Sequence, residues 1–440
     1  MVRYAAAGRV RRPRPEAARP VSVRPPRLRA VHGVALLFLA NGLSHPSLWP
    51  RLPELRDAVG ATDATLGLAL LGTGLGGVVG SAVAPAVARW LGTRRAAVVT
   101  AVLLAVVAIS AGLAPSVPLL FAAFAVMGLT DGVADISQNH LLFEVQRRGA
   151  RSLASRMHAV WSVGALGGTG IGTVAATAGV AVATQVGAIA VVVLGLAAVA
   201  ARILRRGLGD PPPPDAEVVA HAGAPVAPVP LEDTARGGRP ARALGRLGPR
   251  AGAWVLVAIA GVVAASIESV ANEWSALTLR DGLGATIAQA GAGPTVFAAA
   301  MLVGRLVGDR AIDRFGPARV AAAGAAAVAI GAGAGLAGAS GLDAPVLLLA
   351  GLAVAGIGAA PLFPLMLQAG DRLDTSGRGV AVASLAARAG MLAVPVSVGA
   401  VSDGLGPVVA FTLLPVAGAV AALVLPAALR RRADVDGPAV

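Results

Sequence analysis

Three acidic residues lie inside otherwise apolar stretches of this sequence. Asp131 and Asp135 belong to the apolar segment 117–142 and are four residues apart, so a helix would carry both on one face. Glu268 lies about two thirds of the way along the segment 251–276. An ionised side chain at the centre of a bilayer costs roughly 2.5 to 3.5 kcal/mol on insertion scales, so such a residue faces protein or a water-filled cavity. Burial disfavours the charged carboxylate, and two neighbouring acids disfavour joint ionisation. We therefore expect proton binding and release near neutral pH at Asp131, with Asp135 shaping a gate and Glu268 binding a proton or a solute.

Five other polar side chains in apolar segments are candidates for contacts with a solute. Arg388 is the one arginine deep in such a segment, and it needs a carboxylate partner or an anionic group of the solute. A static ion pair with an arginine is also the alternative role of one of the two aspartates. Amides suit the hydroxyl groups of a sugar-like solute and an indole suits the face of its ring, so the other candidates are Asn41, His45, Asn139 and Trp161. Each of these four, taken alone, is also typical of a hydrogen bond between helices.

The composition indicates what kind of element carries these side chains. Of the 440 residues, 56% are hydrophobic and only 14% are charged, and the mean hydropathy is +0.75. The charges separate apolar runs of about 20 residues, the length that crosses about 30 Å of hydrocarbon. We expect twelve such spans, at about 31–50, 64–88, 96–114, 117–142, 154–177, 180–203, 251–276, 287–308, 318–339, 345–370, 379–401 and 408–429. The predicted fold is an all-α membrane protein with twelve transmembrane helices in two pseudo-symmetric six-helix bundles.

The polar stretches around these spans predict the domain organisation. Residues 1–30 carry nine arginines and repeated prolines without an apolar core, which indicates a disordered basic tail and no signal peptide. Residues 31–203 and 251–429 are predicted to form the two bundles. The proline-rich stretch 204–250 cannot bury enough apolar surface to fold alone and is predicted to be a linker. Residues 430–440 are predicted to form a second tail.

Several classes of function are excluded by the residues that are scarce or missing. The sequence has no cysteine, which rules out thiol nucleophiles and cysteine-ligated metals, and its five histidines show no H-E-x-x-H spacing. We expect no metal and no cofactor, and no nucleophile–base pair or phosphate loop supports an enzyme. The formal net charge of +14 does not indicate nucleic-acid binding, because only 3% of the residues are aromatic and the basic residues flank apolar runs.

Arginine is distributed unevenly between alternate loops, which predicts the orientation in the membrane. Basic residues in short loops accumulate on the cytoplasmic side. The loops predicted to be outside hold only Arg51, Arg56 and Arg280. The loops predicted to be inside, with the last tail, hold Arg89, Arg94, Arg95, Arg147, Arg148, Arg151, Arg310, Arg314, Arg319, Arg372, Arg378, Arg430, Arg431 and Arg432. We therefore predict a multi-pass protein of the cytoplasmic membrane, with both termini and the linker in the cytoplasm.

The two halves of the sequence repeat each other. LRDAVGAT at 55–62 recurs as LRDGLGAT at 279–286, an offset of 224 residues that also pairs Gly92 with Gly316. The repeat implies two bundles related by an axis along the membrane normal, with a solute site between them near the midplane. Stripes of glycine at four-residue spacing predict close helix packing, and we expect them to face the other bundle: Gly72, Gly76 and Gly80 in one span, and Gly164, Gly168 and Gly172 in another.

One inner loop resembles a known family signature. Residues 304–316, which read GRLVGDRAIDRFG, resemble the G-x-x-x-D-x-x-G-R loop of the major facilitator superfamily, whereas the counterpart at 80–95 has Pro85 in place of the acid. Three more stretches are similar to a poorly characterised bacterial inner-membrane branch related to fucose-type sugar:proton symporters: Asn41–Leu43 with Trp49–Pro53, Asp131–Asp135 with Asn139, and Glu268 with Glu273–Leu277. The resemblance covers about residues 33–429 and implies secondary active transport by alternating access.

The resemblance also implies gating at the charged inner loops. The candidates in the second half are Gly304, Gly308, Asp309, Arg310, Asp313, Arg314 and Gly316, and those in the first half are Arg89 and Arg95. We add His158, near the inner end of its span, for which a structural role is the alternative. We also add Glu273, near the outer boundary, where solvation of the helix end is the alternative.

These observations together favour a secondary transporter. We predict proton-coupled symport of a sugar-like or other polar solute by a monomer whose partners are the solute, protons and the lipid bilayer. A proton-coupled drug or metabolite exporter is the alternative, although the span 154–177 lacks the glycine–proline dipeptide of the antiporter signature. A channel is a further alternative, which would need neither a buried proton acid nor a repeat of the two halves.

Overall fold

The computed structural model describes residues 28–149, 153–207, 251–374 and 378–430, and all regular structure in these ranges is helical. The first half contains α1 (Leu28–Ser44), the 3-10 helix η1 (His45–Arg51), α2 (Leu52–Ala58), α3 (Asp63–Leu91), α4 (Thr93–Gly112), α5 (Val117–Gly149), α6 (Ala154–Thr177) and α7 (Val182–Gly207). The second half contains α10 (Ala251–Ser269), the π-helix η4 (Val270–Trp274), α11 (Ser275–Leu277), the π-helix η5 (Thr278–Gly282), α12 (Ile287–Phe315), α13 (Pro317–Gly341), α14 (Val346–Ala359), α15 (Leu362–Leu373), α16 (Arg378–Leu405), α17 (Pro407–Phe411) and α18 (Leu413–Arg430). Most of the predicted tails and linker lies outside the described residues.

The prediction of an all-α membrane protein is confirmed. Within the described ranges, eleven helices are long and apolar enough to cross a membrane. The first predicted span is divided between α1, which has 17 residues, and η1, which follows it directly. Pro46 and Pro50 lie in η1 and have no N–H group, so the α-helical hydrogen-bond ladder cannot continue through them.

Two other spans depart from a single regular α-helix. The predicted span 251–276 extends to Gly282, because α10 continues through the π-helices η4 and η5. π-Turns inside helices are frequent at functional sites, and η4 begins two residues after Glu268. The predicted span 345–370 is interrupted between α14 and α15 at Pro361, which cannot donate the hydrogen bond that would continue α14.

The repeat seen in the sequence extends to the helix boundaries. α3 and α12 begin and end at the same 224-residue offset, and each starts with a capping box, at Thr62 and Thr286. Each ends at a glycine in the left-handed region, with φ of 79° at Gly92 and 82° at Gly316. A side chain is strained in that conformation, so glycine at both positions allows a sharp turn into the next helix.

The glycine stripes pack inside the first bundle, so the expectation that they face the other bundle is wrong. A Cβ atom built on Gly76 would overlap the carbonyl oxygen of Ala125 in α5, and one built on Gly168 would overlap that of Leu43 in α1. The other members of the two stripes meet α5, α1 or η1 in the same way. The stripes allow helix backbones of one bundle to approach closely, which is the usual role of small residues in membrane proteins.

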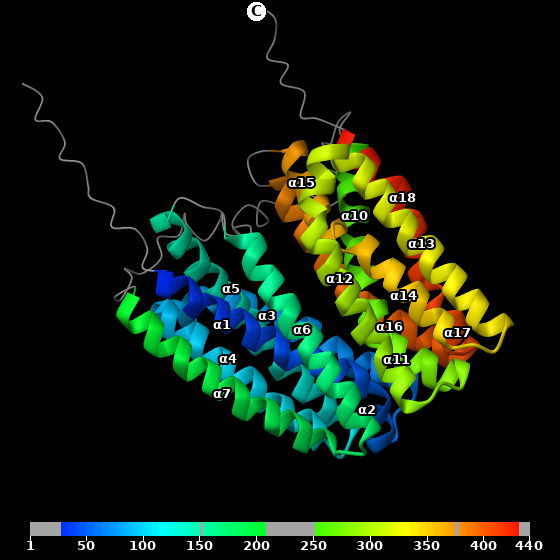
Figure 1. Cartoon of the computed structure of the whole chain (residues 1–440), viewed down its shortest axis with the longest axis horizontal. Coiled ribbons are helices and arrows are strands. Elements are labelled where there is room, and N and C mark those ends of the chain that lie inside the picture. Colours follow the sequence, from blue (N-terminus) through cyan, green and yellow to red (C-terminus); the bar gives the residue numbers. More distant parts are fainter. Residues whose placement is uncertain (1–27, 150–152, 208–250, 375–377, 431–440) are drawn as a thin grey trace, which may run out of the picture.

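The two bundles meet through other faces of α3 and α6. α3 packs against α16, where a Cβ atom on Gly67 would overlap the carbonyl oxygen of Pro395, and α6 packs against α12. The Thr173 hydroxyl donates to the carbonyl oxygen of Gly291 over 2.7 Å. Figure 1 shows the bundles converging where α2 and α11 lie and diverging toward α15 and the start of α6. We call the first of these the closed end, which carries residues 52–63 and 278–286, and the second the far end.

The burial pattern fits a protein surrounded by lipid. Large apolar side chains such as Phe124, Phe297 and Trp274 are fully buried between helices. Others lie open on the outer faces of the bundles, where Val191 of α7 is 71% exposed and Leu423 of α18 is 76% exposed. Such exposure of large apolar side chains is typical of a surface that contacts hydrocarbon.

Candidate functional site

A pocket lies between the two bundles, halfway along the helices that face each other. The first bundle contributes Trp49 of η1 and Trp161 of α6, and the second contributes Glu268 of α10, Asn272 of η4 and Arg305 of α12. The rest of the wall is formed by Ser162, Ala165, Ala298 and Met301. The pocket thus combines a carboxylate, an amide, a guanidinium and two indoles, groups that can hydrogen-bond to a polar molecule and pack against its apolar faces.

Arg305 reaches from the second bundle to the first. Its Nη1 atom donates to the hydroxyl of Ser162 over 2.5 Å, and its guanidinium carbon lies 5.6 Å from the centre of the Trp161 ring, within the range of a cation–π contact. The sequence interpretation missed Arg305 as a site residue, because it treated this arginine as part of the inner loop. Its position inside the predicted span 287–308 was the available signal.

Asp131 is joined to the pocket by two hydrogen bonds. The Asn41 Nδ2 atom donates to Asp131 Oδ1 over 2.8 Å, and the Trp161 Nε1 atom donates to Asn41 Oδ1 over 2.7 Å. Three predicted site residues, from α1, α5 and α6, therefore lie together. Asp131 is half-buried and Asn41 is buried, so neither is out in solvent.

A second group of predicted residues surrounds Asp135, toward the far end. Asn139, one turn along α5, donates to Asp135 Oδ1 over 2.8 Å. Electrostatic interactions link Asp135 to Asp131, to His158 of α6 and to Arg388 of α16. Asp135 and His158 are exposed between the bundles, and Arg388 contributes a positive charge from the opposite side. The structure thus brings both acids and Arg388 into one polar region.

Three predicted residues lie at or near the pocket in other ways. Glu268 is half-buried in the pocket wall and interacts electrostatically with Arg305. His45 packs its ring against the ring of Trp49, with the centroids 5.9 Å apart, so it supports the wall from behind. Glu273 is held within its own helix by the hydroxyl of Ser269, which donates over 2.9 Å, and it is not among the residues that line the pocket.

The charged residues of the predicted gating loops lie apart from the pocket, at the far end, whereas Gly304 directly precedes the pocket residue Arg305. Gly304 packs against α14, where a Cβ atom would lie 2.6 Å from the carbonyl oxygen of Ile357, whereas Gly308 faces open space. The charged residues are exposed, and no ion pair joins them to another described residue: Asp309, Arg310, Asp313, Arg314, Arg89 and Arg95. Gly316 serves as the turn between α12 and α13.

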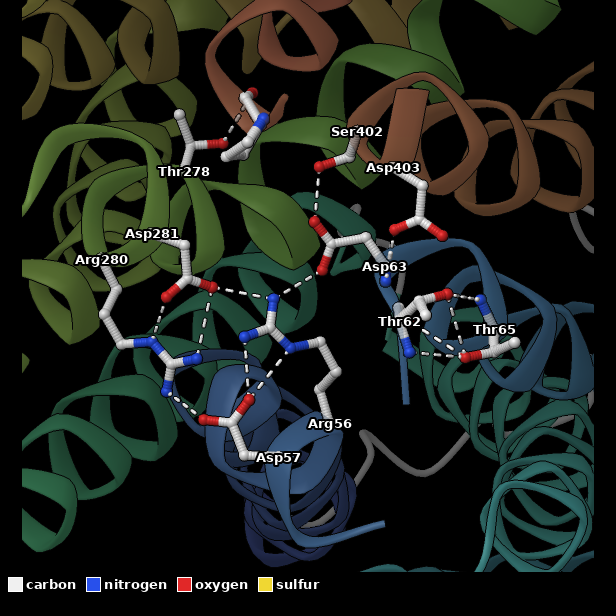
Figure 2. Close-up of polar contacts among 11 residues, drawn as sticks. Arg56, Asp57, Thr62, Asp63, Thr65, Thr278, Arg280, Asp281, Ser402 and Asp403 are labelled. Atoms are coloured by element: carbon white, nitrogen blue, oxygen red, sulfur yellow. Dashed lines mark hydrogen bonds and ion pairs between the residues drawn. The ribbon is translucent and has the colours of Figure 1, made fainter. Parts of the chain in front are cut away.

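A square of ion pairs joins the bundles at the closed end (Figure 2). Arg56 contacts Asp281 at 2.8 Å and Arg280 contacts Asp57 at 2.9 Å, so each pair crosses from one bundle to the other. Each arginine also contacts the aspartate next to it in sequence, at 2.8 Å for Arg56 and 2.7 Å for Arg280. These four residues are the repeated Arg-Asp of LRDAVGAT and LRDGLGAT. The sequence interpretation used the two arginines to count charges and to align the repeat, and it did not predict their pairing with the aspartates, although their repetition was a signal of it.

Asp63, the first residue of α3, extends this network to α16. Its carboxylate accepts from Arg56 at 2.6 Å and from the Ser402 hydroxyl at 2.5 Å. Its backbone N–H, one of the free donors at the start of a helix, donates to the carboxylate of Asp403 over 2.9 Å. The closed end is therefore held by contacts of two kinds, ion pairs and a helix cap that comes from the other bundle.

The charges of this network reinforce one another. Partial burial acts to raise the pKa of Asp57, but hydrogen bonds from Arg280 and Arg56 outweigh it and hold the pKa below the ordinary value of 3.8. Burial acts to lower the pKa of Arg56, and hydrogen bonds to Asp63 and Asp57, with the charge of Asp281, raise it above the ordinary value. Asp57 and Arg56 therefore stay ionised throughout the physiological pH range.

Comparison with known proteins identifies relatives over nearly the whole chain. The family model described as Major Facilitator Superfamily matches residues 34–272 and 257–439. An uncharacterised transporter of Sinorhizobium fredii is 28% identical over 396 residues, which cover 90% of this chain and 97% of that protein. The crystal structure of the nucleoside transporter NupG (D323A mutant) has a TM-score of 0.67 at 14% identity and covers 91% of this chain and 100% of its own. A D-xylose–proton symporter has a TM-score of 0.64 at 16% identity, with 90% and 96% covered. At these identities the two solved structures show a shared fold.

Proposed function

Because this chain belongs to the major facilitator superfamily and is therefore a membrane transporter, we propose that it is a proton-coupled symporter that takes up a sugar-like polar solute by alternating access. The observation that carries this proposal is the pocket between the bundles, whose wall is joined by hydrogen bonds to the acid Asp131. One site can then bind the solute while the other binds the proton. A transporter that moves both together needs these two sites within reach of each other.

The chemistry of the pocket favours a solute with several hydroxyl groups. The Oδ1 atom of Asn272 is buried without a hydrogen-bond partner, and the carboxylate of Glu268 also faces the pocket. Both can accept hydrogen bonds from hydroxyl groups of the solute, while the guanidinium of Arg305 can donate hydrogen bonds to oxygen atoms of the solute. Two indoles, Trp49 and Trp161, offer apolar faces to a ring. A hydroxylated ring satisfies all of these groups, and the solved relatives of the same fold include transporters of xylose and nucleosides.

The proposed orientation places the closed end outside the cell. The arginines of alternate loops favour a cytoplasmic far end, with both termini and the linker on that side of the cytoplasmic membrane. The ion pairs of the closed end would then seal the outer side, and the structure would represent an inward-facing state. In this state Asp131 and the pocket release the proton and the solute to the cytoplasm.

Transport into proteoliposomes tests this function. The purified protein is reconstituted with a pH-sensitive dye inside the vesicles, and D-xylose and then a series of nucleosides are added outside. We expect internal acidification on addition of the transported solute, and uphill accumulation of that solute under an inward proton gradient. Asp131→Asn should abolish uphill accumulation and preserve exchange of labelled solute, because the binding pocket is retained. Asp343→Asn, which removes an exposed carboxylate at a turn, is the matched control and should behave as the parent.

Two results would overturn this proposal. Solute leaving the vesicles against an inward proton gradient would identify the alternative, a proton-coupled exporter. Undiminished uphill accumulation by Asp131→Asn would show that this carboxylate does not carry the proton.

A further inference from the structure

Asn41 lies between the proposed proton site and the pocket, and its orientation is determined by its neighbours. The indole N–H of Trp161 can only donate a hydrogen bond, so the amide atom that faces it must be the oxygen. The amide nitrogen then faces Asp131 and donates to Oδ1. Both ends of the amide are used by the protein, and the residue is only 8% exposed. Asn41 is therefore placed to act on Asp131 rather than on a solute.

The backbone holds Asn41 and Trp161 in this arrangement. A Cβ atom on Gly42 would overlap the carbonyl oxygen of Trp161, and one on Gly164 would lie 2.5 Å from the carbonyl oxygen of Leu39. α1 and α6 are thus in backbone contact at this level. This backbone contact fixes the spacing of the two helices at the level of the hydrogen bond between Asn41 and Trp161.

The contacts continue from Trp161 into the second bundle. The guanidinium of Arg305 lies over the Trp161 ring at 5.6 Å and donates to Ser162, the next residue of α6. Both Trp161 and Arg305 line the pocket. An unbroken series of contacts therefore runs from Asp131 through Asn41 and Trp161 to Arg305, which belongs to the other bundle.

We propose that Asn41 is the positioning residue that couples the proton on Asp131 to the pocket, because Trp161 holds its amide in the orientation that favours the ionised carboxylate. This inference rests on the proposed function and assigns it a coupling element. A hydrogen bond to an ionised group is about twice as strong as one between neutral groups. The donor on Asn41 therefore promotes proton release in the state seen here, and movement of Arg305 or occupation of the pocket acts on that donor through Trp161.

Other ionisable groups also act on this site. Asp135 lies one turn along α5 and is linked electrostatically to Asp131, to His158 of α6 and to Arg388 of α16. α3 faces α5 with its glycine stripe, and α4 brings Thr93 against His140, more than two turns from Asp131. The test must therefore change Asn41 or Trp161 without altering a charge.

Infrared titration of the solute-free, full-length protein in nanodiscs tests the proposal directly. The absorption of protonated carboxyl groups is followed against pH, and the contribution of Asp131 is identified by subtracting the Asp131→Asn spectrum. Asn41→Leu keeps the branched shape of the side chain and removes the donor, and we expect the titration midpoint to move upward by about one pH unit, a tenfold change in proton affinity. Trp161→Phe keeps an aromatic ring without the N–H donor and frees the amide to rotate, so a smaller upward shift is expected.

The shifts in titration midpoint caused by the two substitutions should not be additive, because Trp161 acts on Asp131 through Asn41. The double variant is expected to titrate like Asn41→Leu alone. Ser44→Ala is the matched control, since it removes a buried hydroxyl one turn along α1 that donates only to its own helix, and its midpoint should equal that of the parent. An unchanged midpoint in Asn41→Leu, or in a well-folded Trp161→Phe if the first variant does not fold, overturns the inference. Full additivity of the two shifts also overturns it.

The infrared titration and the transport assay test different claims, and either claim can fail without the other. If the solute moves with protons but Asn41→Leu titrates as the parent, the coupling role of Asn41 is wrong and the symport proposal stands. If the midpoint shifts but no proton accompanies the solute, the symport proposal is wrong.

Discussion

The ion pairs of the closed end are expected to set the balance between the two conformations of the transporter. The double substitution Asp57→Asn and Asp281→Asn removes both pairs that cross between the bundles and leaves Arg56 its contact with Asp63. Exposed ion pairs contribute about 0.2 to 1 kcal/mol each. The side chains here are 16% to 52% exposed and form a network, so we take about 1 kcal/mol for each pair. The total of about 2 kcal/mol corresponds to a roughly 30-fold change in the ratio of the two conformations.

The distance between the bundles at the far end reports this change. The sequence has no cysteine, so one cysteine in each bundle gives clean labelling. Arg156→Cys, at the exposed start of α6, and Phe315→Cys, at the exposed end of α12, are labelled with nitroxides and measured by double electron–electron resonance. We expect a shorter far-end distance to become more populated in the double variant, because opening of the closed end brings the far ends together. Asp343→Asn is the control, and an unchanged distance distribution in the double variant would refute the role of the ion pairs.

Three further predictions concern the closed end, the pocket and the packing of α6. Because the pKa of Asp57 is held below 3.8 in the closed end, its ion pairs stabilise that end at pH above 3.8 and lose this effect as the pH falls through the lowered pKa. The far-end distance should therefore shorten during an acid titration of the parent, and less so in Asp57→Asn. Arg305→Gln removes a charged hydrogen bond and the contact with Trp161, and should raise the KM for the solute by about tenfold or more in initial-rate measurements, with a smaller effect on the maximal rate. Gly168→Ala should destabilise the protein by about 1 to 3 kcal/mol, because its Cβ atom would meet the carbonyl oxygen of Leu43. Gly170→Ala, on the open face of the same helix, should leave the thermal midpoint unchanged or raise it. Equal melting of these two variants would contradict the packing argument.

The helical architecture could be predicted because it depends on local patterns. Apolar runs of about 20 residues are sufficient to identify spans. The predicted span 154–177 has the bounds of α6, and the repeat gives α3 and α12 equivalent ends. The break at Pro361 is visible as a residue without an N–H, although apolar residues on both sides obscure it. The π-helix η4 has no such local signal.

The site was predictable only in part, because contacts between helices depend on rotation about their axes. An ionisable residue in a span is a candidate from the sequence alone, which identified Asp131 and Glu268. The sequence does not show that Asn41 faces Asp131, or that Arg305 faces the pocket rather than the inner loop. The glycine stripes illustrate the same difficulty. Their spacing predicts a close contact, but nothing in one sequence tells which helix makes it.

The repeated Arg-Asp motif makes the contacts between the two bundles stronger on one side of the transporter than on the other. In the proposed orientation the outer side has a symmetric set of ion pairs, because Arg56 and Asp57 meet their counterparts Arg280 and Asp281. The inner side cannot have a symmetric equivalent, since the loop 304–316 carries acids while its first-half counterpart has Pro85. An empty transporter should therefore favour the state with the outer side closed.

Opening of the outer side then requires free energy that a ligand can supply only by binding more tightly to the outward-facing state. Proton binding supplies this free energy if the hydrogen bond from Asn41 to the ionised Asp131 weakens when the outer side opens. The infrared titration, repeated in the Asp57→Asn and Asp281→Asn double variant, should then give a higher midpoint for Asp131 than in the parent, and an equal midpoint would separate proton binding from the conformational change.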